Sequence, residues 1–180
     1  MTTSHVATVI DYGFDIPRLL AEARLFKETY DKNLEQLCVT GKSPSSDYKE
    51  GSGGLVYEWN KMVRTRKAVI STEDEFVHFL DMFKGTYTEE VYNKLSETYK
   101  VGRLRFMYVK PKTCYTWHMD STPRIHIPLY TDPKQCGLII EDSIIRMPAN
   151  GSAYIVDTTK YHTAFNAWLE WRIHLVGVLL

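Results

Sequence analysis

The chain has 180 residues, enough for one domain with a substantial core but too few for two comfortable ones. Lys plus Arg number 22, as do Asp plus Glu, so the net charge is zero and gives no reason to expect nucleic acid or an anionic membrane as a partner. No apolar run approaches the roughly 18 residues of a membrane span, and there is no signal-peptide pattern. The three cysteines form no C-x-x-C pair. Together these features predict a cytoplasmic protein with free thiols.

The first hundred residues are predicted to be mainly helical. Asp15 is placed to cap a helix, because its side chain can accept a hydrogen bond from the first helical turn. Apolar residues then recur at helical spacing, namely Ile16, Leu19, Leu20, Ala23 and Phe26. The stretch 41–54 is rich in Gly and Ser, so we expect a loop there, either a lid over a site or, more simply, a solvated linker.

A second helix is predicted over 72–83. Thr72 and Glu75 have the spacing of a capping box, and Gly85 marks a stop. The apolar face of this helix would contain Phe76, Phe79, Leu80 and Phe83. A third helical pattern follows, with Val91, Tyr92, Leu95 and Tyr99. The basic residues that precede these helices, Lys61, Arg64, Arg66 and Lys67, form either a surface for an acidic partner or, more simply, a solvated face.

From residue 101 onward the apolar period changes from helical spacing to two, which is typical of strands. Turn residues separate short segments and thereby predict eight strands, over 102–109, 114–120, 124–130, 136–140, 143–147, 152–157, 162–167 and 170–178. Eight strands in this length fit a double-sheet jelly roll or a small barrel. We therefore expect one mainly β domain, 1–180, in which a helical part, 1–100, packs on a β core, 101–180, that contains the site.

One face of the predicted sheet is polar on strand after strand. His118 and Asp120 share a face because the side chains of a strand alternate, with Trp117 and Met119 opposite. Strand faces in water usually collect Lys, Glu, Thr and Ser. The same alternation here instead collects Arg124, His126, His162, Asn166, Arg172 and His174. This set predicts a polar cavity rather than a solvated surface.

The order of four of these residues indicates a metal site. His118 and Asp120 form an H-x-D pair, and His162 is placed to arrive from a distant strand. Two histidines and one carboxylate on one face of an octahedral iron leave three neighbouring positions open. Arg172 follows one strand later and is suited to balance the charge of a dianionic co-substrate. The H-x-D spacing is weak evidence by itself, so the prediction depends on this order and context.

Residues 100–178 resemble the aspartyl/asparaginyl β-hydroxylase-like branch of the iron(II)- and 2-oxoglutarate-dependent oxygenases. The resemblance is carried by RLRFMYVKP (103–111), WHMD (117–120), RIHIPL (124–129), NGSAYIVDTTKYHTAFN (150–166) and WRIHLV (171–176), and less specifically by DYGFDIPRLLAEARLF (11–26). It implies a double-stranded β-helix, the cupin-like form of the jelly roll, with supporting helices.

The resemblance also implies the roles of particular residues. His118, Asp120 and His162 fall at the iron-ligand positions, and Arg172 falls at the arginine that grips the distal carboxylate of 2-oxoglutarate. Arg124 and His126 match an R-x-H element that lies beside a carboxylate of the co-substrate or the substrate. We further expect Asn166, on the same strand face as His162, to orient that imidazole.

The activity implied is that of a dioxygenase that consumes O2 and 2-oxoglutarate, releases succinate and CO2, and hydroxylates an amino acid or a protein side chain such as Asp, Asn or Pro. The vertebrate-type members of the branch lack the carboxylate ligand, whereas Asp120 is present here. This departure brings the chain closer to the full-triad amino-acid hydroxylases and argues against a protein Asp or Asn substrate.

The residues alone leave two other classes open. One is a non-catalytic cupin-like binding module that retains the cavity. The other is a hydrolase that binds zinc on the same three ligands, although such an enzyme has no standing need for Arg172. The sequence does not identify the substrate.

Overall fold

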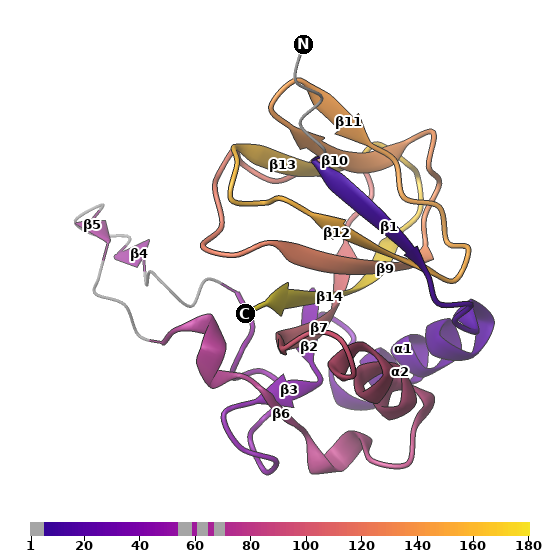
Figure 1. The fold of residues 1–180 in the computed structure, drawn as a ribbon, viewed down its shortest axis with the longest axis vertical. Coiled ribbons are helices and arrows are strands. Elements are labelled where there is room, and N and C mark those ends of the chain that lie inside the picture. The colour runs from indigo at the N-terminus through magenta and orange to yellow at the C-terminus, as the bar shows by residue number, and fades with distance from the viewer. Residues whose placement is uncertain (1–5, 54–58, 61–64, 67–70) are drawn as a thin grey trace.

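A computed structural model describes residues 6–53, 59–60, 65–66 and 71–180 of the chain. Most of its strands belong to two antiparallel sheets (Figure 1). The larger sheet has the order β1 (Ala7–Asp11), β12 (Ser152–Val156), β9 (Arg124–Tyr130), β14 (Arg172–Leu179), β7 (Val101–Val109) and β2 (Gln36–Cys38). The smaller sheet has the order β11 (Ser143–Ile145), β10 (Cys136–Ile140), β13 (His162–Asn166) and β8 (Thr113–Cys114).

Two further strand pairs are short. β3 (Thr40–Gly41) pairs with β6 (His78–Phe79), and β4 (Trp59–Asn60) pairs with β5 (Thr65–Arg66). The side chains of the predicted basic face, Lys61, Arg64, Arg66 and Lys67, lie outside the described residues.

The larger sheet separates two different environments. Its outer face carries Ile125 and Ile127 of β9 and Phe106 of β7, which are buried in the main apolar core. The register pairs Tyr154 with His126, His126 with Val176, and Val176 with Arg105, so these four side chains form one row on the inner face. The polar face predicted from the sequence is therefore the inner one, between the two sheets.

Two α-helices cover the outer face of the larger sheet. They are α1 (Ile16–Tyr30) and α2 (Tyr87–Ser96), which lie at the opposite end of Figure 1 from β10, β11 and β13. Asp15 caps α1 as expected, since its carboxylate accepts the amide hydrogen of Arg18 at 3.0 Å. The buried face of α1 is the predicted one, formed by Ile16, Leu19, Ala23 and Phe26.

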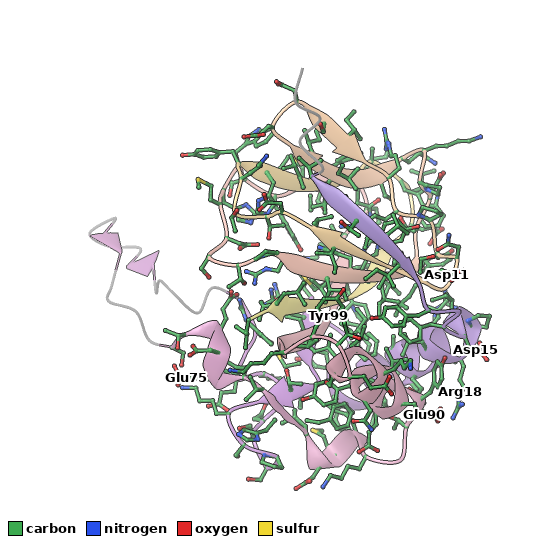
Figure 2. All side chains as sticks on the ribbon, in the orientation of Figure 1. Asp11, Asp15, Arg18, Glu75, Glu90 and Tyr99 are labelled. Atoms are coloured by element: carbon green, nitrogen blue, oxygen red, sulfur yellow. The ribbon has the colours of Figure 1, made fainter. Side chains whose placement is uncertain are left out.

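Polar side chains of α1 hold the first turns of α2. The carboxylate of Glu22 accepts the backbone amides of Tyr87 and Thr88 at 2.7 and 2.8 Å, which places a negative charge at the positive end of α2. On the surface Arg18 pairs with Glu90 at 3.1 Å (Figure 2). Within the described residues, no helix has the length and apolar character needed to cross a bilayer.

The prediction of a helix over 72–83 is wrong. The capping box of Thr72 and Glu75 exists, but it opens only a 3-10 turn, η1 (Glu73–Glu75), and β6 and a second 3-10 turn, η2 (Asp81–Phe83), follow. Between the two 3-10 turns the backbone bonds to other segments: the Phe76 carbonyl accepts from the Arg103 amide, and the Leu80 amide donates to the Val39 carbonyl. The described part of residues 1–100 is thus less helical than expected and includes strands β1 to β6.

The predicted β segments are mostly confirmed. β9 and β10 have the expected bounds, β7, β11, β12 and β13 differ by one or two residues at one end, and β14 differs at both ends by no more than two. The strand expected over 114–120 is reduced to β8 and an isolated bridge between His118 and His162. The ladder is interrupted at Thr116, whose carbonyl bonds to the His118 imidazole at 2.7 Å instead of to a neighbouring strand.

The Gly- and Ser-rich stretch is anchored as far as residue 53, and residue 54 lies outside the described residues. The Tyr48 carbonyl accepts from the Cys38 amide, and Gly51 is buried. The carbonyls of Gly51 and Gly53 accept from the Arg103 guanidinium. These contacts anchor the end of the described stretch against β7, and of its described residues Gly53 alone lines the cavity.

Candidate metal centre and its cavity

A cavity of about 1090 Å³ opens between the two sheets. Its walls include the inner-face residues of β7, β9 and β14 on one side and those of β10 and β13 on the other. The cavity contains all six residues predicted for the site, namely His118, Asp120, Arg124, His126, His162 and Arg172. The tertiary structure therefore brings together side chains separated by up to 54 positions in the sequence.

Three of these side chains converge. His118 and Asp120 follow β8, and His162 is the first residue of β13, to which the isolated bridge holds His118. One ligand atom from each of the three residues lies within 4.8 Å of the others. The Nε2 atom of His162 is 3.6 Å from the Asp120 carboxylate. Two imidazoles and a carboxylate in this arrangement form a donor set suited to non-haem Fe(II).

Backbone carbonyls fix the orientation of both imidazoles. The Nδ1 atom of His118 is 2.7 Å from the Thr116 carbonyl, and that of His162 is 3.0 Å from the Lys160 carbonyl. A carbonyl oxygen can only accept, so Nδ1 carries the hydrogen in each ring and Nε2 presents its lone pair. Burial lowers the pKa of His162, which favours the neutral form that a metal requires.

Asn166 does not orient His162, contrary to our expectation. Its side-chain amide donates to the carbonyls of Val109, Lys110 and Glu170 at 2.9–3.0 Å and accepts at its oxygen from the Trp168 amide. Asn166 therefore links the end of β7 to the start of β14. The imidazole of His162 is oriented by the Lys160 carbonyl instead of by Asn166.

Arg124 has different partners from those that the sequence led us to expect. Its guanidinium forms a two-point ion pair with Asp120, at 2.9 Å for both contacts. It also donates to both carboxylate oxygens of Glu73, at 2.7 and 2.8 Å, and to the Thr122 hydroxyl at 2.9 Å. These contacts occupy all three of its nitrogen atoms, so Arg124 holds the carboxylate of the triad instead of facing a free carboxylate in the cavity.

Glu73, which the sequence did not identify as a site residue, holds this network of ion pairs together. It is 7% exposed and bridges Arg124 and Arg103, the latter at 2.9 Å. Burial by itself would raise the pKa of Glu73, but the two arginines outweigh it and lower the pKa to about 2. No local pattern identifies this role, because η1 meets the cavity only through the tertiary fold.

Arg172 lies deep in the cavity beside His174. Its guanidinium is 3.2 Å from the imidazole of His174, and the residue is 3% exposed. Within the described part of the chain it has no carboxylate partner. Burial lowers the pKa of Arg172 to about 10, and it lowers the pKa values of His126 and His174 well below 6.5. The arginine is therefore a buried cation among neutral imidazoles.

Arg105 is a second cavity residue that sequence reasoning missed. It alternates with Leu104 and Phe106 in β7, so the period-two signal that identified the other polar residues was present here too. It is 6% exposed, and its Nε and Nη1 atoms are buried without a hydrogen-bond partner in the described structure.

Large aromatic and apolar side chains form a solvent-exposed part of the cavity lining. Trp117, Met119 and Tyr161 line it, yet they are 53–62% exposed to solvent. Trp117 and Met119 flank His118 in sequence. Strand alternation would place them opposite it, but all three line the cavity, because this segment is not a continuous strand.

Comparisons with known proteins agree with this geometry. The sequence model of the aspartyl/asparaginyl β-hydroxylase family matches residues 42–178, a range that includes the three converging side chains and Arg172. No curated protein matches the chain.

Two solved structures share the fold. One is a prolyl-4-hydroxylase from Pseudomonas putida, with 12% identity, a TM-score of 0.50, and coverage of 98% of this chain and 92% of that chain. The other is an oxidoreductase of the 2OG-Fe(II) oxygenase family from Burkholderia pseudomallei, with 10% identity, a TM-score of 0.51, and coverage of 98% and 84%. The predicted double-stranded β-helix is thereby confirmed.

Proposed function

This chain belongs to the aspartyl/asparaginyl β-hydroxylase family, and from that premise we propose that it is an Fe(II)- and 2-oxoglutarate-dependent dioxygenase. The proposed reaction hydroxylates an amino acid or a protein side chain, with succinate and CO2 as co-products. The observation that carries the proposal is the convergence of His118, Asp120 and His162 in a cavity that also buries Arg172.

The three side chains fit Fe(II) by their chemistry. Both histidines present Nε2, and the carboxylate of Asp120 keeps lone pairs for a metal even while it accepts from Arg124, because each oxygen has two. Bound Fe(II) with 2-oxoglutarate would supply the activation of O2 that an organic side chain cannot provide. His118, Asp120 and His162 would hold the metal.

Arg172 is suited to hold the co-substrate. A guanidinium offers two parallel hydrogen bonds to one carboxylate, and this pairing gains strength where water is excluded. Arg172 is 3% exposed and has no carboxylate of the described chain beside it. The distal carboxylate of 2-oxoglutarate would supply the missing negative charge.

The remaining contacts position these groups. Arg124 fixes the orientation of Asp120, and Glu73 in turn holds Arg124 from the other side. The backbone carbonyls of Thr116 and Lys160 prevent the two imidazoles from rotating. Arg172 and His174 are 3% and 2% exposed, so the part of the cavity around them is shielded from water.

The proposal is tested by turnover and by metal binding measured side by side. With Fe(II), 2-oxoglutarate and O2, we expect succinate formation, at least as uncoupled turnover without a primary substrate. His118→Ala and Asp120→Ala should each abolish it and weaken metal binding, because each removes one of three ligands. His78→Ala and Asp142→Ala, which replace exposed residues of the same types outside the cavity, serve as matched controls.

Three outcomes would contradict the proposal. Intact Fe(II) and 2-oxoglutarate binding without any succinate on a broad substrate panel would count against an oxygenase. Failure of anaerobically prepared protein to bind metal at the triad would favour a binding module instead. Activity that persists without O2 and 2-oxoglutarate would indicate a hydrolase.

A further inference from the structure

Arg105 is a buried cation for which the proposed function has no use. It occupies the inner face of β7, paired on one side with Val176 and on the other with Cys38. Two of its three guanidinium nitrogens, Nε and Nη1, have no hydrogen-bond partner in the described structure, and it forms no ion pair there. Its side chain lines the cavity.

The other charged groups near Arg105 do not neutralise it. Arg103 and Arg124 already share Glu73, and they add repulsion to the cost of burial. Burial and the neighbouring guanidinium of Arg103 lower the pKa of Arg105 to about 9. A buried charge without a counter-ion costs several kcal/mol, so its presence in a cavity indicates that an anion from outside completes the site.

Arg105 and Arg172 occupy different parts of the inner face. Arg172 is paired with Val109, whereas Arg105 lies four residues earlier on the same strand. The row of Met107 and His174 separates them. Arg172 lies against His174, and Arg105 shares its row with His126. The cavity therefore offers two separate cationic positions.

We propose that Arg105 binds a carboxylate of the primary substrate, so that the substrate is an organic acid anchored apart from the co-substrate. This inference rests on the proposed function, since it assigns Arg172 to 2-oxoglutarate and leaves Arg105 for the molecule to be hydroxylated. The carboxylate belongs either to a free acid or to an acidic peptide, and the two sources share the same recognition chemistry.

Two successive ligand-induced changes in melting temperature test the proposal. The first is the rise when 2-oxoglutarate is added to protein loaded with Mn(II) as a redox-inert substitute for Fe(II). The second is a further rise when an acid is added to that complex at saturating 2-oxoglutarate. The probes are acetate, a panel of amino acids and dicarboxylic acids, short acidic peptides, and the uncharged amide of each.

We expect at least one acid, but not its amide, to give the second rise with the natural protein. Arg105→Met should weaken that acid at least about tenfold and leave the first rise intact, because a charge-assisted hydrogen bond is lost from one site only. Arg105→Lys should keep part of the second rise. Arg172→Met should lose the first rise, and Arg18→Met, on the surface of α1, should change neither.

Folding does not confound this comparison. Arg105→Met removes an unpaired buried charge and keeps an apolar chain about as long as the aliphatic part of arginine, so the ligand-free variant should melt no lower than the natural protein. Where an acid also supports turnover, Arg105→Met should raise its KM and leave the KM for 2-oxoglutarate unchanged.

Two results would overturn the inference. One is that no acid in the panel, acetate included, gives a rise that depends on Arg105. The other is that Arg105→Met removes the 2-oxoglutarate rise while Arg172→Met retains it, since Arg105 would then hold the co-substrate. Absence of the first rise in the natural protein would instead count against the proposed function itself.

Discussion

Glu73 supports the metal-binding candidates although it is not one of them. Its carboxylate bonds to Arg103 and Arg124, and Arg124 in turn holds Asp120. Ser121 and Thr122 also donate to Glu73 at 3.1 and 3.2 Å. A single buried carboxylate thus balances two guanidinium groups that line the cavity. Removing it would leave Arg103 buried without an ion pair and Arg124 paired with Asp120 alone.

We predict that Glu73→Gln destabilises the fold by about 3–5 kcal/mol, the usual cost of breaking a buried ion pair from one side. Urea denaturation measures this change. Glu97→Gln, which breaks the exposed pair with Lys94, is the matched control and should cost no more than about 1 kcal/mol. Equal losses of unfolding free energy in the two variants would show that the buried ion pairs stabilise the fold no more than an exposed pair does.

The same residue predicts a pH dependence. The pKa of Glu73 falls from 4.5 to about 2 on folding, so the folded state binds its proton less readily than the unfolded state. The stabilisation is therefore complete above about pH 4.5 and is lost as the pH falls toward 2. Unfolding free energies measured from pH 6 to pH 2 should fall more steeply for the natural protein than for Glu73→Gln, and parallel curves would refute this assignment.

Strand β1 ties the N-terminal part to the β core. It pairs with β12 from Ala7–Val156 to Asp11–Ser152 and so forms one edge of the larger sheet. Between β1 and α1 the chain passes Gly151, whose carbonyl accepts the Phe14 amide at 3.1 Å. Gly151 has φ +89°, and a Cβ there would lie 2.9 Å from the Phe14 carbonyl oxygen. The junction of two elements thus requires glycine for both conformation and space.

We predict that Gly151→Ala costs more than Gly13→Ala. Gly13 also has a positive φ, +63°, but a Cβ there meets nothing within 4 Å. The control should therefore show only the conformational cost of about 1–2 kcal/mol, and Gly151→Ala should add the steric cost to it. Thermal unfolding of the two variants compares them. Equal losses would mean that the loop moves aside without penalty.

At the scale of the whole molecule, charge is distributed unevenly. The chain carries no net charge, yet four arginines line the cavity against the two carboxylates Glu73 and Asp120. Arg105 and Arg172 are left without acidic partners in the described residues. These two unpaired buried charges lower the stability of the ligand-free protein, and binding of anionic ligands should raise it.

We predict that 2-oxoglutarate with Mn(II) stabilises the protein through Arg172. At one hundred times the dissociation constant the gain is about 2.7 kcal/mol, or roughly 5–10 °C in Tm for a chain of this size. Arg172→Gln should lose most of this shift, whereas Arg18→Gln, which replaces an exposed arginine, should keep it. Differential scanning fluorimetry measures both. A full shift in Arg172→Gln would exclude Arg172 as the carboxylate partner.

The sequence determined the features that depend on local periodicity. The period-two pattern located β9 and β10 to the residue and separated the polar face of β14 from its apolar one. Asp15 and the apolar spacing after it specified α1. These signals work because side-chain direction follows directly from backbone geometry, which neighbouring residues alone determine.

The tertiary structure decided everything that depends on distant partners. The capping box at Thr72 favoured a helix, but β6 pairs with β3 instead, and the ion pairs of Glu73 place its carboxylate at the cavity. Only the packed sheets show that Arg124 serves Asp120 and that Arg105 has no counter-ion. The physical reason is that the energy of a buried charge is set by the groups that surround it in space, and a sequence records only which charges exist.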